Sequence, residues 1–378
     1  MNPRTRSALL AFLSRLTRRS IVALSAEARR QDLILPLSAP YRADGPTLSV
    51  GLQAADPGRL KAALLAYEGH FPRRPLWEGP PHSYAGPCDL TLDLTTGAVR
   101  LANQEWGRVP MPLPGRRFCW QLTLEGANGS RRTRMTGHYL PVEGRGVSAA
   151  YFQGDDYVDH EAQSAGDHQQ VLQLLRQHHA CDPVIEIGCA TGGLLAALDA
   201  AGFQAIGLDI SEWAVARARQ RLGPDRVWLC DVERDPLPSG ATVHGPFGVI
   251  LLLSVLEHFR DPFGVLAKLT PLAAPGSLLL LHTTNADSLS HILFGRQWEG
   301  YFDWTHLGVD RVSVRRLREE LPQLGWRCER LVTHRVWDGD ADPTRATLRE
   351  WWAADARFRQ LLAERDLGDL ITCVAIKD

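Results

Sequence analysis

Lysine and closely spaced cysteine are both scarce in this 378-residue sequence. Only three of the 42 basic residues are lysine (Lys61, Lys268 and Lys377), and we interpret the arginine excess as the bias of a GC-rich bacterial genome. No two cysteines form a Cys-x-x-Cys pair, so the sequence predicts reduced thiols in a cytoplasmic protein and no metal site. The seven cysteines are Cys88, Cys119, Cys181, Cys189, Cys230, Cys328 and Cys373.

Long hydrophobic runs are missing as well. No apolar stretch approaches the roughly 20 residues that a helix needs to cross a bilayer. The short run Ala8–Leu13 is interrupted by Ser14 and Arg15, so we expect no cleavable secretion signal. The sequence therefore predicts a protein without transmembrane segments.

Charge is balanced overall but not along the chain. The net charge of −1 divides into +9 for residues 1–150 and −10 for residues 151–378. This asymmetry could attract an anionic substrate to the first half, or it could let the two halves attract each other. The length suggests two domains, at roughly 100–200 residues each.

Residues 1–31 carry seven arginines, and Leu9, Leu13 and Leu16 recur at helical spacing. This pattern predicts a basic amphipathic helix. Such a helix could make peripheral contact with an anionic membrane surface. We favour the alternative that it packs on its own protein or on a second subunit, as in a homodimer, because amphipathic helices are common in soluble proteins.

Residues 32–150 read as an α+β accessory domain. Pro57–Tyr67 has the start and spacing of a short helix, and Phe71–Pro87 holds five prolines and reads as a loop. Alternating apolar residues predict a hairpin over 89–101 and further strands after it. Residues 151–180 read either as a linker or as a lid over a ligand, followed by a helix that leads into the next domain.

From residue 181 onward, buried strands alternate with helices, which predicts an α/β fold with a mostly parallel, doubly wound sheet, Rossmann-like, covered on both faces. We expect seven strands over residues 181–378. Their ranges are 184–188, 205–208, 227–230, 248–253, 277–282, 327–336 and 370–376.

A glycine loop follows the first of these strands in Glu186-Ile-Gly188-Cys-Ala190-Thr-Gly192. Such a loop at a helix start brings backbone N–H groups close to a ligand. Asp209 ends the second strand, 21 residues after Gly188, where a carboxylate suits the two hydroxyls of an adenosine ribose. The loop lacks the Gly-x-Gly-x-x-Gly of dinucleotide sites, and the chain has no P-loop.

With Asp231 after strand three and Ser254-Val-Leu-Glu257-His258 after strand four, residues 184–376 resemble a class I S-adenosylmethionine-dependent methyltransferase, in its ubiquinone-biosynthesis-type branch. The resemblance implies S-adenosylmethionine as cofactor and assigns positions to it. Gly188 and Gly192, with Ala190 in place of a glycine, would line the methionine part, and Glu186 would support the loop. The remaining assignments are Asp209 at the ribose, Asp231 and Val232 at the adenine, and Ser254 near the sulfonium, with Ile210 as a further cofactor-binding residue.

Three residues are candidates for chemistry at the acceptor. His258 could remove a proton from an oxygen nucleophile, because the pKa of histidine is near neutral. His306 could do the same or be structural, and Glu257 could orient His258, contact the substrate or help to bind a metal, the last being least favoured.

The acceptor itself is not written in the sequence. We expect O-methylation of a small molecule, such as a secondary metabolite, a sugar or a quinone-like phenol. Alternatives are a glycan, protein or RNA acceptor, or a protein that kept the fold without activity. A nucleic-acid acceptor is less favoured, because no Asn/Asp-Pro-Pro-Tyr/Phe or Pro-Cys motif follows strand four.

Overall fold

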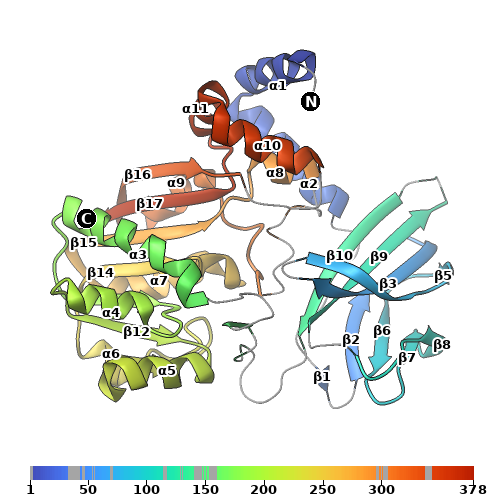
Figure 1. Cartoon of the computed structure of the whole chain (residues 1–378), viewed down its shortest axis with the longest axis horizontal. Coiled ribbons are helices and arrows are strands. Elements are labelled where there is room, and N and C mark those ends of the chain that lie inside the picture. Colours follow the sequence, from blue (N-terminus) through green and yellow to red (C-terminus); the bar gives the residue numbers. More distant parts are fainter. Residues whose placement is uncertain are drawn as a thin grey trace.

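The computed structural model shows a strand-rich N-terminal region, a large sheet covered by helices, and a group of helices that joins both ends of the chain (Figure 1). It describes residues 3–32, 43–44, 47–52, 54, 56–68, 71–113, 117–127, 129, 131–139, 147, 149, 151–152, 160–294, 298, 300, 305–336 and 343–378.

Two antiparallel sheets make up the strand-rich region. The first has the order β1-β2-β6-β7-β8, and the second has the order β10-β9-β3-β4, with β5 also pairing with β3. The strands are β1 (Ala43–Asp44), β2 (Thr47–Leu52), β3 (Gly58–Glu68), β4 (Phe71–Glu78), β5 (His82–Tyr84), β6 (Cys88–Asp93), β7 (Ala98–Leu101), β8 (Gln104–Arg108), β9 (Arg117–Gly126) and β10 (Arg131–Tyr139).

This region corrects the predicted α+β accessory domain. The helix expected over Pro57–Tyr67 is wrong, because Leu60, Ala62 and Leu64 alternate inward along β3, which pairs with β9 on one side and β4 on the other. The loop expected over Phe71–Pro87 is also wrong, because it contains β4 and β5. Prolines are tolerated in β4, since it pairs only with β3. No helix occurs among the described residues from 43 to 139.

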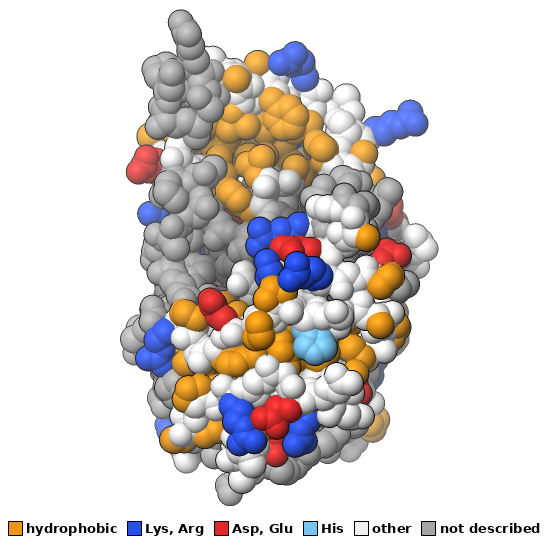
Figure 2. All heavy atoms as spheres, turned by 90° about the vertical axis from the view of Figure 1, so that its right-hand side faces the viewer, with side chains coloured by type: hydrophobic (Ala, Val, Ile, Leu, Met, Phe, Trp, Pro, Cys, Tyr) orange, Lys and Arg blue, Asp and Glu red, His pale blue; other side chains and the backbone are white. Residues whose placement is uncertain are grey.

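The predicted hairpin over 89–101 is confirmed as β6 and β7, whose turn is held by Asp93 Oδ1 accepting from the N–H groups of Thr95 and Thr96. On one outer face of the molecule (Figure 2), basic and acidic side chains are interspersed. Ion pairs of the strand-rich region include Lys61–Glu125 at 3.1 Å and Arg131–Glu125 at 3.8 Å. The basic residues there therefore belong in part to a solvated, ion-paired surface.

The C-terminal sheet confirms the predicted seven strands, with boundaries that differ by a few residues. Their order is β13-β12-β11-β14-β15-β17-β16, and only β17 runs antiparallel to its neighbours. The strands are β11 (Val184–Ile187), β12 (Ala205–Asp209), β13 (Val227–Leu229), β14 (Phe247–Leu253), β15 (Ala273–Thr284), β16 (Trp326–His334) and β17 (Leu370–Lys377).

Helices cover both faces of this sheet. One buried cluster joins the sheet to α3, α4 and α5, and a second joins its other face to α6, α7 and α9. The strand order reverses between β11 and β14, and the carboxyl ends of the parallel strands point toward the strand-rich region (Figure 1). Such a reversal is where ligands bind in open α/β sheets. The helices are α3 (His160–Gln177), α4 (Gly193–Ala200), α5 (Glu212–Leu222), α6 (Ser239–Thr242), α7 (Pro262–Leu269) and α9 (Val314–Gln323).

The N-terminal segment forms two helices, where one was expected. They are α1 (Pro3–Arg15) and α2 (Arg18–Asp32), and the break is capped by reciprocal bonds between Thr17 and Ser20. Leu13, Leu16 and Ile21 are buried against the helices α8 (Leu289–Phe294), α10 (Pro343–Ala354) and α11 (Ala356–Glu364). The apolar face of this segment therefore packs on its own protein, as favoured above.

Helices α10 and α11 are separated at Asp355, whose Oδ1 accepts from two N–H groups at the start of α11. α2 also contacts β10, so the N-terminal helices touch both major parts of the molecule. In the part of the chain that the structure describes, no helix combines the length and apolar character needed to cross a membrane.

Candidate functional site

The glycine loop lies between β11 and α4, where the chain turns sharply. Gly188, Ala190 and Gly192 all have positive φ, at 76°, 47° and 77°. A Cβ on Gly188 would lie 2.7 Å from a methyl of Val255, so only glycine fits there. The Ala190 substitution keeps the left-handed backbone at the cost of about 1–2 kcal/mol. The predicted loop is thus confirmed as a tight turn at the N-terminus of a helix.

Asp209 at the end of β12 holds this loop in place. Its Oδ2 accepts from the Ala190 N–H at 2.8 Å, and its Oδ1 accepts from the Ser211 N–H at 2.8 Å. Burial raises the pKa of Asp209, and these N–H bonds oppose the shift. Each carboxylate oxygen has two lone pairs, so both could still accept a ligand hydroxyl.

Glu186, at the start of the loop, has a buried carboxylate oxygen that indicates a site for a ligand group. It is buried, and its Oε2 has no hydrogen-bond partner among the described residues. Burial, aided by the charge of Asp209, raises the pKa of Glu186 to about 8. A buried carboxylate oxygen without a partner is costly, and a ligand ammonium group would remove that cost. The residues present therefore fit the amino-acid end of S-adenosylmethionine.

The residues predicted to contact adenine differ in how well their surroundings suit that role. Asp231 Oδ1 accepts from the N–H groups of Glu233 and Arg234, so part of its carboxylate caps a turn. The Val232 side chain is buried in the core, so a contact with the cofactor would have to come from its backbone N–H. Ile210 is 39% exposed beside Asp209, which is unusual for a large apolar side chain and suits packing on a flat ring.

The segment predicted as linker or lid lies against the glycine loop at two points. Phe152 stacks on Trp213 at 5.3 Å between ring centroids, in a cluster with Ala190. At the start of α3, Glu161 accepts from Thr191 Oγ1 at 2.7 Å and pairs with Arg221 at 2.9 Å. These contacts favour the lid interpretation, whereas residues 153–159 lie outside the described part. Sequence reasoning did not identify Glu161, because its partners are 30 and 60 residues away.

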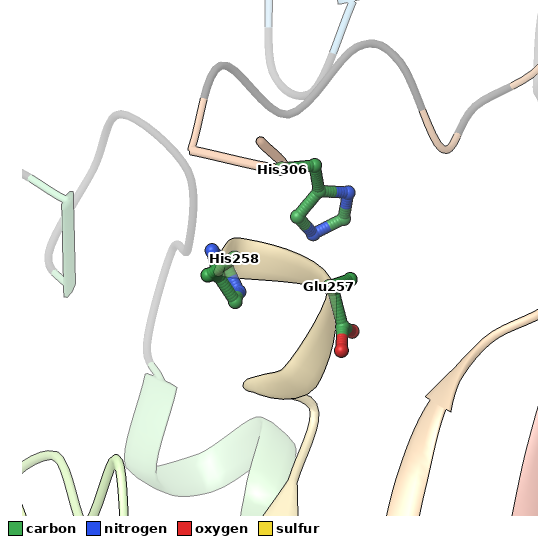
Figure 3. Close-up of side chains that lie close together, drawn as sticks. All are labelled: Glu257, His258 and His306. Carbon is green, nitrogen blue, oxygen red and sulfur yellow. The ribbon is translucent and has the colours of Figure 1, made fainter. Parts of the chain in front are cut away.

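A second group of side chains lies beyond the end of β14. Leu256 inserts into the core and so fixes the short turn that carries Glu257 and His258. The rings of His258 and His306 are 4.7 Å apart between centroids, and both lie near Glu257 (Figure 3). Glu257 is buried, and its Oε2 accepts from Thr283 Oγ1 at 2.8 Å. The structure thus brings all three predicted catalytic residues together.

His306 is oriented by its own loop. Its Nδ1 lies 2.9 Å from the carbonyl oxygen of Gly300, which can only accept, so Nδ1 donates and the neutral ring presents Nε2 as its basic nitrogen. The backbone at this point is tied to the turn by Gly308 N–H donating to the carbonyl of Glu257 at 2.9 Å. A histidine in this arrangement is suited to accept a proton.

The same three residues could also hold a metal ion. One ligand atom from each of Glu257, His258 and His306 lies within 4.8 Å of the others. The expectation of no metal site relied on the absence of close ligand spacing in the sequence. Wide spacing in the sequence does not exclude a metal site, because His306 lies beside Glu257 and His258 although it is 48 residues away from His258 in the chain. A carboxylate with two imidazoles suits several divalent metals.

Ser254 directly follows β14 and precedes the turn that carries Glu257 and His258. Its φ is 52°, and its hydroxyl is 3.0 Å from His282 Nδ1. The assignment of Ser254 to the cofactor had a sequence basis, but His282 was not identified, since its place opposite Leu253 depends on the pairing of β14 with β15.

Comparison with known proteins places these features in context. A family model described as a methyltransferase domain matches residues 159–370. A ubiquinone biosynthesis O-methyltransferase from Methylococcus capsulatus is 29% identical over 124 residues, covering 32% of this chain and 52% of that protein. One of the same name from Thiobacillus denitrificans is 32% identical over 111 residues, covering 29% and 47%. The chain thus spans about half the length of these relatives.

Among solved structures, a SAM-dependent methyltransferase from Archaeoglobus fulgidus aligns with a TM-score of 0.40 and 19% identity, covering 57% of this chain and 97% of that one.

Proposed function

This chain belongs to the methyltransferase-domain family, and on that premise we propose that it transfers a methyl group from S-adenosylmethionine to a hydroxyl of a small molecule. The observation that carries the cofactor assignment is the buried, unpartnered Oε2 of Glu186 beside the glycine loop. The matched relatives are ubiquinone biosynthesis O-methyltransferases, which supports an oxygen acceptor of phenolic type.

The residues of the loop would bind the cofactor through three groups. Glu186 would pair with the ammonium of the methionine part, and Asp209 would accept from the ribose hydroxyls. Ile210 would pack against the adenine. When bound, the cofactor supplies an electrophilic methyl group on a sulfonium. Holding the acceptor oxygen in line with that methyl can contribute roughly 7–11 kcal/mol to the rate.

The acceptor would be activated at the group beyond β14. Its hydroxyl would give its proton to His258 or to Nε2 of His306, while Glu257 orients the turn through its bond with Thr283. Proton removal by such a base adds roughly 10²–10⁴-fold to the rate. If a metal occupies the group, it would instead lower the pKa of a bound hydroxyl.

The activity is tested by incubating the protein with S-adenosylmethionine and a panel of phenolic and sugar hydroxyls, and by measuring release of S-adenosylhomocysteine. We expect turnover with at least one phenolic acceptor. If calorimetry detects no cofactor binding, with or without an acceptor, the result would instead favour a protein that kept the fold without activity. A mobility shift with RNA that weakens steeply with salt would favour a nucleic-acid acceptor.

Cofactor binding should release a proton, because Glu186 is mostly protonated below pH 8 in the free protein. Because the pKa of Glu186 is higher in the folded protein than in the unfolded chain, the folded protein loses stability as the pH rises from the unfolded pKa through the folded pKa. A bound ammonium group would remove that loss. At pH 6.5, calorimetry in buffers of different ionisation enthalpy should show about one proton released per cofactor bound. Glu186→Gln should release none, and equal release from both proteins would contradict the pairing.

The contact of α3 with the loop should control how long the cofactor stays bound. Glu161→Gln weakens the bonds to Thr191 and Arg221, which are partly exposed, so we expect about 1 kcal/mol, or a roughly five-fold faster release of S-adenosylhomocysteine in stopped flow. Glu212→Gln, an exposed acid on α5, is the matched control. An unchanged release rate in Glu161→Gln would show that the contact does not retain the cofactor.

A further inference from the structure

Two histidines, His282 and His334, lie on the face of the sheet that is covered by α3. Side chains alternate along β15, and Leu278 and Leu280, which share the side of His282, pack in the α3 cluster. Thr283 points the other way, toward Glu257. The rings of His282 and His334 are 5.5 Å apart between centroids, and His334 Nε2 is 2.9 Å from Thr372 Oγ1. This pair is therefore separate from the group of Glu257, His258 and His306.

The pair is connected to the cofactor loop through Ser254. The Ser254 N–H donates to the His282 carbonyl at 2.7 Å, and its hydroxyl is 3.0 Å from His282 Nδ1. Ser254 is exposed and adopts a left-handed backbone, an arrangement that costs energy in any residue other than glycine. The next residue, Val255, lies against Gly188. The strained turn thus holds one hydroxyl beside the loop that receives the methionine part.

Both rings are surrounded by groups that keep them uncharged. Burial lowers the pKa of His282 to about 4, with His334 and Arg335 contributing. Burial also lowers the pKa of His334, as do Arg335 and Arg330, while Asp167 on α3 opposes the shift. Both shifts favour the uncharged form of each ring. An uncharged pair can lie near a sulfonium cation without repelling it, whereas an imidazolium could not.

Resting on the proposed function, in which Ser254 lies near the sulfonium, we propose that His282 is the positioning residue that orients the Ser254 hydroxyl toward the sulfonium methyl. The Ser254 hydroxyl would donate a hydrogen bond to the neutral Nδ1 of His282. The lone pairs of Ser254 Oγ would then be left to accept a C–H···O contact from the methyl. C–H groups beside a positive sulfur are polarised, and weak C–H···O contacts of this kind recur in proteins. His334 and Thr372 hold the His282 ring from behind. The pair thus recognises the one group in which S-adenosylmethionine differs from its product.

That difference gives the experiment, which needs no acceptor and no turnover. The affinities for S-adenosylmethionine and S-adenosylhomocysteine are measured by calorimetry in the full chain. Ser254→Ala and His282→Ala should each weaken the first by about two- to five-fold and leave the second unchanged. His282→Asn, which keeps a side-chain acceptor, should recover part of the loss. His244→Ala, an exposed histidine between α6 and β14, is the control and should change neither affinity.

Binding of S-adenosylhomocysteine also reports that each variant is folded. If His282→Ala weakens both ligands equally, or neither, the positioning role of His282 is refuted, and the same result for Ser254→Ala refutes the contact with the methyl. If the unaltered protein binds neither ligand, the cofactor assignment fails instead, so the two failures can be told apart.

Discussion

Asp209→Ala is expected to abolish detectable binding of S-adenosylmethionine. The substitution removes the carboxylate, so the cofactor would lose two charge-assisted hydrogen bonds from its ribose hydroxyls, each contributing about 1.5–3 kcal/mol. It would also release the N–H groups of Ala190 and Ser211, which it holds at 2.8 Å each, so the loop itself would loosen. Together these losses correspond to at least about a hundred-fold in affinity. Isothermal titration at pH 8 measures the effect directly.

Two further variants separate the ligand contact from the loop contact. Asp209→Asn keeps the shape and one acceptor oxygen, so it should bind more weakly than the natural protein but better than the alanine variant. Asp225→Asn removes an exposed acid that precedes β13 and should bind normally. Circular dichroism confirms that each variant is folded. An affinity within two-fold of normal in Asp209→Ala would remove the ribose assignment.

The sheet could be predicted from sequence because its parallel strands are buried on both faces and therefore appear as short apolar runs between helices. Asp209 could be proposed as a cofactor residue from sequence alone, because it directly follows a predicted strand at a set distance from the glycine loop. The strand-rich region was harder. Leu60, Leu64 and Leu65 fit a helical spacing as well as a strand, and only pairing with β4 and β9 decides between them. Local pattern cannot supply that information.

The parts of the site that the sequence did not reveal depend on contacts between distant segments. His282 meets Ser254 across the pairing of β14 with β15, and Glu161 meets Thr191 only when α3 packs on the loop. His306 reaches His258 from a separate loop, so the three possible metal ligands have no recognisable spacing in the sequence. In each case the contact partner is determined by the tertiary structure and not by the local sequence.

His258→Ala and His306→Ala should lower kcat while leaving cofactor affinity unchanged. If either residue is the base, its removal costs roughly 10²–10⁴-fold at saturating cofactor, because the acceptor hydroxyl then loses its proton only to water. The neighbouring residue at 4.7 Å can take over part of this role, so the double variant should be at least as slow as either single one. Full turnover in both single variants would contradict the role of the pair in catalysis.

A chelator distinguishes the base from a metal at the same three residues. If the histidines act as a base, activity after dialysis against a chelator should be unchanged. If Glu257, His258 and His306 bind a metal, chelation should reduce activity to the level of the alanine variants, and a divalent ion should restore it. Glu257→Gln sharpens the choice, because it removes a charge that a metal needs. A base oriented by Thr283 and the backbone should lose far less from that change than a metal site would.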